Sequence, residues 1–203
     1  FEDTSTLITE NISNLGFNKN NELFMMAVNN IYKISTDTPS FTLYFSGTGE
    51  SDPRAICFDD NNNLLYAGRL GKKVYKITDN NGTPIREFYA GIATSIAPIF
   101  GLAFRDNLVY ISDLEGNYVK TISSTGVITN YIGNGQDTGT IDSEYSLLGS
   151  SIIKPSGMVF DNYGDLYITQ GQYPVTSTDH IKAVGFNTVK WESTPGQKII
   201  EKQ

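Results

Sequence analysis

Four copies of one short sequence pattern run through this chain. Each copy has a small residue, an apolar run that ends in phenylalanine, a turn rich in Gly, Asp and Asn, and a second apolar run that includes an aromatic residue. The four phenylalanines are Phe17, Phe58, Phe104 and Phe160, and successive copies are 41, 46 and 56 residues apart. A repeat with this period requires every copy to form the same small structural unit, so it constrains the fold before any chemistry is considered.

Two further apolar runs follow in each of the first three copies. The third run is NIYKIS at 30–35, KVYKIT at 73–78 and YVKTIS at 118–123, and the fourth is FTLYFSG, IREFYAG or ITNYIGNG. Links this short can only join antiparallel neighbours, so each copy forms a four-stranded antiparallel sheet. Such a sheet cannot bury both faces alone, whereas sheets stacked around an axis cover one another. We therefore predict an all-β fold, a β-propeller with one four-stranded blade per repeat.

A single propeller domain over residues 1–203 is the predicted organisation. The four recognisable blades span about 12–47, 53–91, 98–133 and 154–195. Residues 1–11 are expected to supply a closing strand or a strand of a neighbouring blade, which would remove a free edge. Two alternatives stay open: a compact closed ring of four or five blades, or an incomplete ring whose open edge is covered by another chain or by missing residues. The four repeats favour an incomplete or unusually small ring.

The fourth copy, PSGMVFDNYGDLYIT at 155–169, resembles the NHL repeat, and its long lead-in resembles the inter-blade segment frequent in secreted bacterial NHL proteins. The first three copies are degenerate, with Phe100-Gly101 where Pro-x-Gly is typical. The resemblance implies a propeller that usually has six blades and binds partners on one face. It also favours an extracellular or cell-surface location. The chain begins with Phe1, and we expect a mature form without its signal peptide, a proteolytic product or a portion of something longer.

The composition argues against several kinds of partner and site. The formal net charge is −7, and nucleic-acid binders need a basic surface, so we expect no nucleic-acid partner. No apolar run is long enough for a membrane span. The single cysteine, Cys57, excludes an internal disulfide and is expected to be a small buried apolar group. The single histidine, His180, cannot assemble a tetrahedral zinc site, and a structural role is favoured over a Ser-His-Asp triad.

The candidate binding residues lie in the links that join the second strand to the third and the fourth strand to the next blade. These links emerge on one face of a propeller, which we call the loop face, and long loops on a rigid scaffold are where function concentrates. We expect this face to bind a partner. The candidate residues are Arg69, Asp113, Glu115, Asn117, Asp137, Asp142, Glu144, Tyr145 and Tyr173.

Other acidic residues have simpler explanations. Asp59 and Asp161 follow the repeat phenylalanine, and we expect them to cap hairpin turns through local backbone hydrogen bonds. The segment DTGTIDSE at 137–144 has the carboxylates of a calcium loop but lacks the ligand spacing of an EF-hand, so a solvated acidic loop is favoured there.

The predicted function is a non-enzymatic binding or structural module. A rigid propeller presents its loops to a protein or a glycan, within a larger extracellular, cell-surface or virion-like assembly. Enzymatic activity is disfavoured but left open, and no cofactor is expected. The alternative is a calcium-dependent hydrolase or lactonase that resembles gluconolactonase or strictosidine-synthase-like propellers, whose sites gather Glu, Asn and Asp side chains around a metal in the central tunnel. This chain has Phe100 at the position where those calcium-dependent propellers typically have a ligand Asn.

Overall fold

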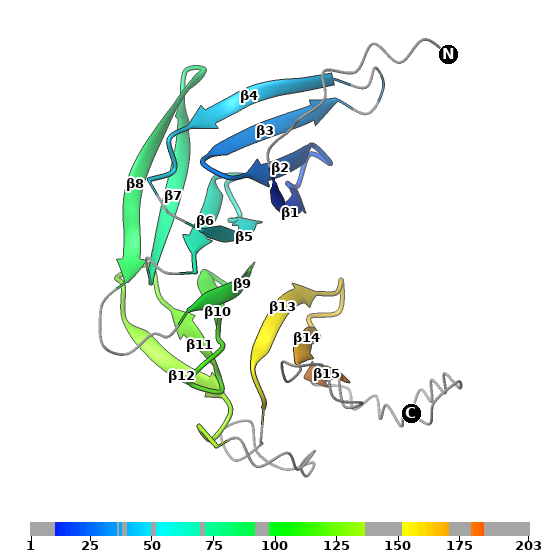
Figure 1. Ribbon diagram of the computed structural model, residues 1–203, viewed down its shortest axis with the longest axis vertical. Coiled ribbons are helices and arrows are strands. Elements are labelled where there is room, and N and C mark those ends of the chain that lie inside the picture. The colour runs from blue at the N-terminus through cyan, green and yellow to red at the C-terminus, as the bar shows by residue number, and fades with distance from the viewer. Residues whose placement is uncertain are drawn as a thin grey trace.

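The computed structural model contains strands and turns but no helix in the residues that it describes, which are 11–35, 37, 40–49, 52–69, 72–91, 98–136, 152–170 and 180–184. The strands form four antiparallel sheets, here called blades 1 to 4, and within each blade they follow one another in chain order (Figure 1). The predicted all-β fold made of propeller blades is confirmed.

The described part of blade 4 has three strands, and each of the other blades has four. Blade 1 is made of β1 (Ile12–Phe17), β2 (Leu23–Ala27), β3 (Asn30–Ser35) and β4 (Ser40–Ser46). Blade 2 is made of β5 (Pro53–Phe58), β6 (Leu64–Gly68), β7 (Lys73–Asn80) and β8 (Thr83–Gly91). Blade 3 is made of β9 (Ile99–Arg105), β10 (Leu108–Asp113), β11 (Tyr118–Ile122) and β12 (Ile128–Ile132). Blade 4 is made of β13 (Pro155–Phe160), β14 (Leu166–Gln170) and β15 (His180–Val184).

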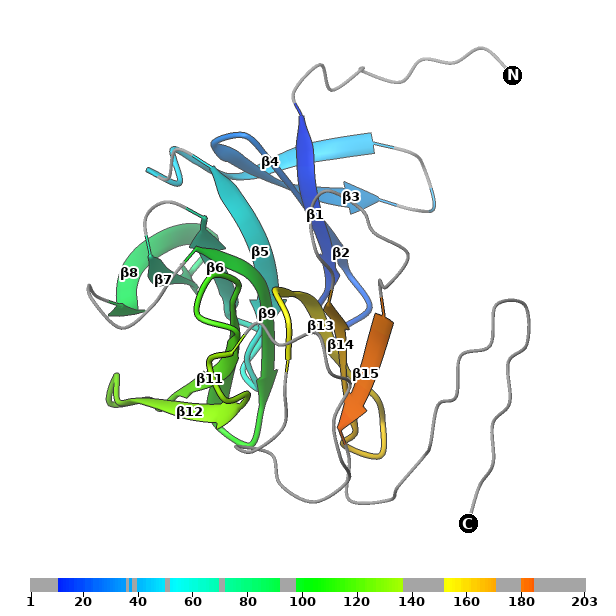
Figure 2. The same ribbon diagram turned by 60° about the horizontal axis from the view of Figure 1, so that its bottom comes forward.

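The blades stand side by side in an arc, with their first strands innermost (Figures 1 and 2). Strand β5 packs against β1 on one side and against β9 on the other, and β9 packs against β13. Within the described strands no comparable packing joins β1 to β13, so the arc is open between blades 1 and 4.

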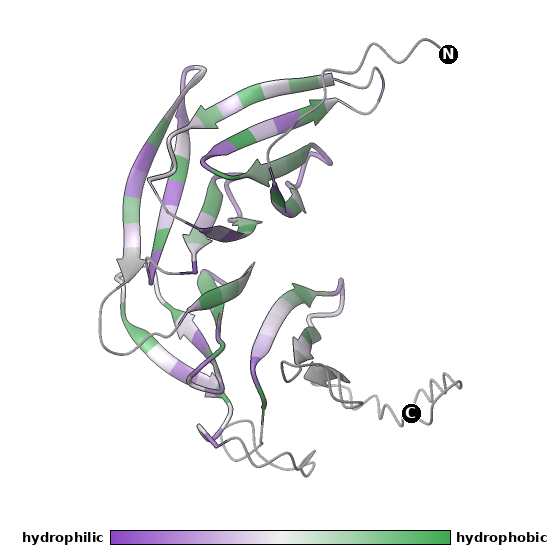
Figure 3. Ribbon diagram, viewed as in Figure 1, coloured by the Kyte–Doolittle hydropathy of each residue, from purple (hydrophilic) through white to green (hydrophobic). Residues whose placement is uncertain are grey.

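Each blade has a preceding face, directed towards the blade before it in the chain, and a following face, directed towards the blade after it. Side chains alternate between the two faces along a strand, and Figure 3 shows the resulting alternation of hydropathy on the outer strands. Three apolar cores fill the spaces between successive blades. In blades 2, 3 and 4 the repeat phenylalanine (Phe58, Phe104 or Phe160) lies on the preceding face and packs into one of these cores.

Aromatic contacts connect the repeat phenylalanine to the blade before it. The ring centroid of Phe58 lies 5.0 Å from that of Phe24 in blade 1. The ring of Phe160 meets Tyr110 of blade 3 edge to face, with centroids 4.9 Å apart. Such pairs contribute about 0.5–1.5 kcal/mol beyond the burial of their area. The repeat therefore encodes the contact between blades as well as the blade itself.

Cys57 lies on the following face of blade 2, against the core that blades 2 and 3 share. Burial among apolar side chains raises the pKa of its thiol, so the thiol stays protonated at neutral pH. It behaves as the small apolar group that the sequence predicts, although the side chain is partly and not fully buried.

One side chain caps the first turn of blades 1, 2 and 4. Oδ1 of Asp59 accepts hydrogen bonds from the backbone N–H groups of Asn61 and Asn63, at 2.9 Å each. Asp161 accepts three such bonds and Asn18 accepts two, at the same place in their repeats. The predicted role of these aspartates as turn caps is confirmed.

The surroundings of Asp59 also set its charge. Burial acts to raise the pKa of this carboxyl, but the contacts with Lys76, whose Nζ lies 2.8 Å from Oδ2, and with Asn63 outweigh burial and leave the pKa below its ordinary value. Asp59 is therefore a charged cap, and the stability that it adds depends on pH.

At Gly101 the backbones of blades 3 and 4 are too close for a side chain. A Cβ at this position would lie 1.9 Å from the carbonyl oxygen of Ser156 in β13. Gly157 holds the same place in the fourth repeat, but a Cβ there would meet only the hydroxyl of Thr169, at 3.1 Å.

We expect Gly101→Ala to lower the free energy of unfolding by about 1–3 kcal/mol, because β9 and β13 must separate to admit the methyl group. Gly157→Ala is the matched control and is expected to have a clearly smaller effect. Urea unfolding followed by fluorescence measures both. Equal losses would contradict the close packing of the two inner strands.

The Asp59→Asn substitution removes the charge of the cap and keeps its shape. A carboxyl with a lowered folded-state pKa adds stability above its unfolded pKa of about 4, and this stability is lost as pH falls through the folded value. We expect the variant to melt below the wild type at neutral pH, and the difference to shrink as pH falls below about 4. Thermal unfolding at a series of pH values checks this. The exposed Asp106→Asn is the control, and a pH-independent difference for Asp59→Asn would refute the assignment.

Candidate binding site on the loop face

The loop face brings together residues that are distant in the sequence. In blade 2, Pro53 at the start of the inner strand pairs with Gly68 at the end of the second strand, and in blade 3 Ile99 pairs with Asp113 in the same way. Residues just before an inner strand therefore lie beside residues just after a second strand.

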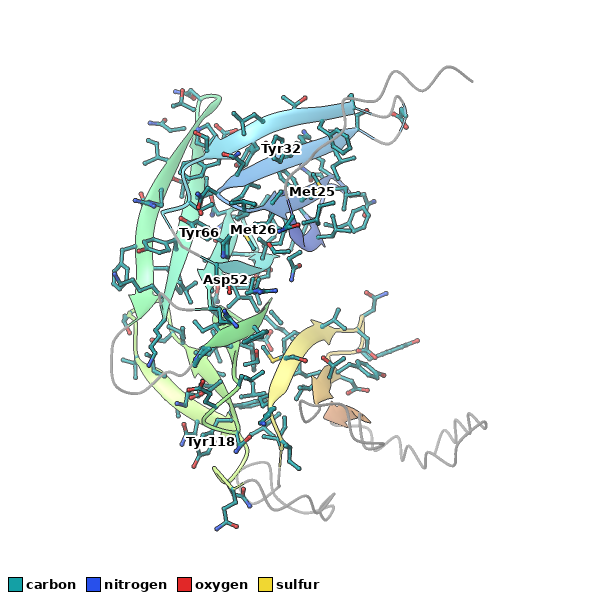
Figure 4. The ribbon with its side chains drawn as sticks, in the orientation of Figure 1. Met25, Met26, Tyr32, Asp52, Tyr66 and Tyr118 are labelled. Carbon is teal, nitrogen blue, oxygen red and sulfur yellow. The ribbon has the colours of Figure 1, made fainter. Side chains whose placement is uncertain are left out.

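Three side chains of blade 2 form a charged group at this face, the Arg54–Asp52–Arg69 cluster. Asp52 precedes β5, Arg54 is its second residue, and Arg69 follows β6. The backbone N–H of Arg69 donates to the carbonyl oxygen of Asp52 at 2.8 Å and holds the two segments together. The Asp52 carboxylate lies between the guanidinium groups, with Oδ1 2.7 Å from Nε of Arg54 and Oδ2 2.6 Å from Nε of Arg69. Figure 4 places Asp52 near the inner strand β5.

Phe100 of blade 3 lies against both arginines. It holds the place in β9 that Arg54 holds in β5, four residues before the repeat phenylalanine, and these two inner strands are neighbours. Cζ of Arg54 lies 5.8 Å and Cζ of Arg69 lies 6.0 Å from the centre of the Phe100 ring. Cation–π contacts of this kind contribute about 0.5–1 kcal/mol each at exposed sites. Phe100 therefore restricts two side chains that would otherwise sample many rotamers.

The cluster retains hydrogen-bond donors for a ligand. The side chains of Arg54 and Arg69 are each 40% exposed. Neither Nε–H is aligned for a hydrogen bond with Asp52, and Nη2 of Arg54 donates a long one of 3.4 Å to the carboxylate. The remaining Nη atoms of the two arginines find no acceptor in the part of the chain that the structure describes.

The charge of the cluster differs from that of the chain. Two guanidinium groups and one carboxylate leave a net positive site on a protein with a net charge of −7. Guanidinium groups are planar donors whose geometry matches carboxylates. The arrangement is suited to holding an acidic group.

Asp113 and Asn117 lie at the same face but are buried. Asp113 ends β10, is 1% exposed and forms an ion pair with the buried Lys120 of β11. Its Oδ1 also accepts the backbone N–H of Gly116 at 2.9 Å. Asn117 has a φ of 55°, and its Oδ1 accepts the backbone N–H of Lys154 at 2.9 Å. These contacts shape the β10–β11 link and attach to it the chain that leads into β13.

Four of the predicted site residues are placed by the structure. Arg69 belongs to the Arg54–Asp52–Arg69 cluster, and Glu115 is exposed in the β10–β11 link, whereas Asp113 and Asn117 are buried beside that link. The other predicted residues lie outside the described part of the chain: Asp137, Asp142, Glu144, Tyr145 and Tyr173. Binding roles for all of these residues stay predictions.

The sequence prediction missed Asp52, Arg54 and Phe100 as a site. Four residues before the repeat phenylalanine, the inner strands carry Ser13, Arg54, Phe100 and Ser156. Aligning the copies at this position would have singled out Arg54 as a cation and Phe100 as an aromatic ring. They lie together because β5 and β9 are neighbouring inner strands.

Metal-ligand clusters and long apolar helices are both absent from the described segments. In the described segments, no group of three or more His, Cys, Asp or Glu side chains is arranged to hold a metal ion. The acidic segment at 137–144 lies outside those segments. None of the described residues belongs to a helix long and apolar enough to cross a membrane.

Solved structures with a similar fold are β-propellers. A protein of unknown function from Bacteroides thetaiotaomicron matches with a TM-score of 0.65 and 16% identity, over 77% of this chain and 42% of its own. A virginiamycin B lyase from Staphylococcus aureus matches with a TM-score of 0.58 and 15% identity, over 88% of this chain and 56% of its own. A chain of a nidogen–laminin complex matches with a TM-score of 0.61 and 13% identity, over 80% of this chain and 57% of its own.

These similarities define the class of the protein as a propeller-type repeat protein. No family model matches the chain, and no curated protein sequence matches it. The chain spans 42 to 57% of the length of the three similar structures.

Asp113→Asn tests whether this carboxylate supports the structure. It removes the charge that pairs with the buried Lys120, and a buried ion pair that loses one partner typically costs about 3–5 kcal/mol. We expect a loss of that size in chemical denaturation. Glu115→Gln changes the exposed neighbour in the same link and is expected to stay within about 0.5 kcal/mol of the wild type. Similar small effects for both variants would contradict the structural role.

Proposed function

We propose that this chain is a non-enzymatic binding module that holds an acidic protein partner on its loop face. The observation that carries the proposal is the Arg54–Asp52–Arg69 cluster, whose two guanidinium groups lie over Phe100 and whose Nη atoms, apart from one bond to Asp52, have no acceptor in the described segments. Arginine and aromatic side chains are the residue types most enriched at the energetic centres of protein interfaces.

The cluster is arranged in advance for a ligand. Asp52 and Phe100 already restrict both arginines, so less side-chain entropy is lost when a carboxylate binds. The chain as a whole carries a net charge of −7, which disfavours unspecific attraction of an acidic partner and adds to the specificity of a positive site. Binding of this kind weakens with salt, because exposed charges are screened.

The comparisons support a binding role at the level of the fold. One similar propeller was solved in a complex of nidogen with laminin, so this architecture serves for binding another protein. Another is a lyase, so the architecture also carries enzymes. The extracellular or cell-surface location is part of the proposal, and it rests on the resemblance of the fourth repeat to secreted NHL proteins.

The calcium-dependent hydrolase alternative requires carboxylate and amide ligands where the inner strands begin. Two guanidinium groups and Phe100 lie at the start of β5 and β9, and their positive charge repels a divalent cation. This placement favours the binding module over that alternative.

The proposal can be tested with a short oligoglutamate peptide as a probe. We expect the peptide to shift the side-chain Nε–H resonances of Arg54 and Arg69 in nuclear magnetic resonance spectra of the labelled protein. The double variant Arg54→Gln/Arg69→Gln is expected to raise the dissociation constant by about tenfold or more, equivalent to two contacts of about 0.7 kcal/mol each.

A matched control separates this site from general electrostatics. Lys19→Gln/Arg105→Gln removes the same charge from the turns at the opposite end of the blades and is expected to change the dissociation constant by less than about twofold. Equal effects of the two double variants, or equal binding of a neutral oligoglutamine peptide, would refute the proposed site.

A further inference from the structure

The preceding face of blade 1 exposes side chains that are buried in the other blades. Leu15 is 55% exposed, whereas its repeat equivalents Ile56 and Leu102 are 6% and 4% exposed. Phe17 is 62% exposed, whereas Phe58 and Phe104 are packed into cores between blades. The same repeat position is covered wherever a blade precedes it.

Most of the preceding face of blade 1 is apolar. Strand register places two rows of side chains across it, which are Leu15, Met25, Tyr32 and Leu43, and Phe17, Leu23, Ile34 and Phe41. Met25 in the middle is 2% exposed, while Leu43 and Phe41 on the outer strand are exposed. Figure 4 labels Met25 and Tyr32 on this face. Its uncovered parts are therefore the inner strand β1 and the outer strand β4.

The following face of blade 4 exposes the complementary surface. Val159 is 60% exposed, whereas its equivalent in blade 3, Ala103, is 6% exposed and packs towards blade 4. Val159 pairs with Tyr167 of β14, which is the repeat equivalent of Tyr110. One chain therefore carries both halves of an inter-blade contact, at opposite ends of its arc.

We propose that a second copy of this chain docks head to tail, with the following face of its blade 4 on the preceding face of blade 1. Phe17 then meets Tyr167 of the partner subunit, as Phe160 meets Tyr110 within the chain. The occupant is a second copy because the chain itself supplies the required face.

Each contact joins two different surfaces, the preceding face of blade 1 and the following face of blade 4, so it is heterologous. Two copies related by a two-fold axis close a ring through two identical contacts. Each contact buries the same repeat positions that are buried between successive blades within one chain. Apolar burial is the main source of stability for such faces. This assembly is independent of binding at the Arg54–Asp52–Arg69 cluster.

Sedimentation velocity of the 203-residue chain tests the proposal. The wild type is expected to form a dimer as its concentration rises. Phe17→Glu and Val159→Glu, from the two sides of the contact, are each expected to raise the dimer dissociation constant by at least about 100-fold, because a carboxylate would be buried without a partner. Val127→Glu is the control, since Val127 is as exposed as Phe17 but lies in the β11–β12 turn.

Mixing the two variants identifies the geometry. Phe17→Glu keeps the following face of blade 4 and Val159→Glu keeps the preceding face of blade 1, so an equimolar mixture is expected to regain one contact and sediment as a heterodimer. Circular dichroism verifies that both variants are folded. A wild type that stays monomeric, or a dimer that Phe17→Glu dissociates and Val159→Glu does not, would overturn the proposal.

Discussion

Burial of apolar faces between successive blades is the constraint on which the rest of this structure depends. A single four-stranded sheet exposes two apolar faces to water, and neither can be covered from within the blade. In blades 2 to 4 the preceding face is covered by the blade before it, and the side chains that meet there include Leu64, Tyr66 and Ile111, which are fully buried. The sequence repeat exists because every blade needs the same contact.

The loop face follows from that packing. Because β5 and β9 stand side by side, Arg54 and Phe100 occupy equivalent places on neighbouring strands and come into contact. Asp52 neutralises part of the charge and fixes the second arginine, Arg69. A rigid scaffold thus positions a small positive site on an acidic protein, without a long loop.

Much of the fold was predictable from the sequence, because its signals are local. The repeat phenylalanines located the inner strands, and Asp59 and Asp161 were identified as turn caps from their neighbours alone. The candidate site was harder, because it depends on contacts between distant segments. Asp113 has the position of an exposed loop carboxylate, and only the approach of Lys120 from the next strand shows that it is buried. Arg54 and Phe100 belong to different repeats, and their contact emerges only once two blades are packed together.

The central claim is that the repeat phenylalanine joins each blade to the blade before it. The most direct test is the coupling free energy between Tyr110 and Phe160, measured by urea unfolding in a double-mutant cycle with leucine substitutions. The account predicts a coupling of about 0.5–1.5 kcal/mol for this pair, and none that can be measured between Tyr110 and Phe104, which lie on opposite faces of blade 3. No coupling between Tyr110 and Phe160, or equal coupling for the two pairs, would contradict it.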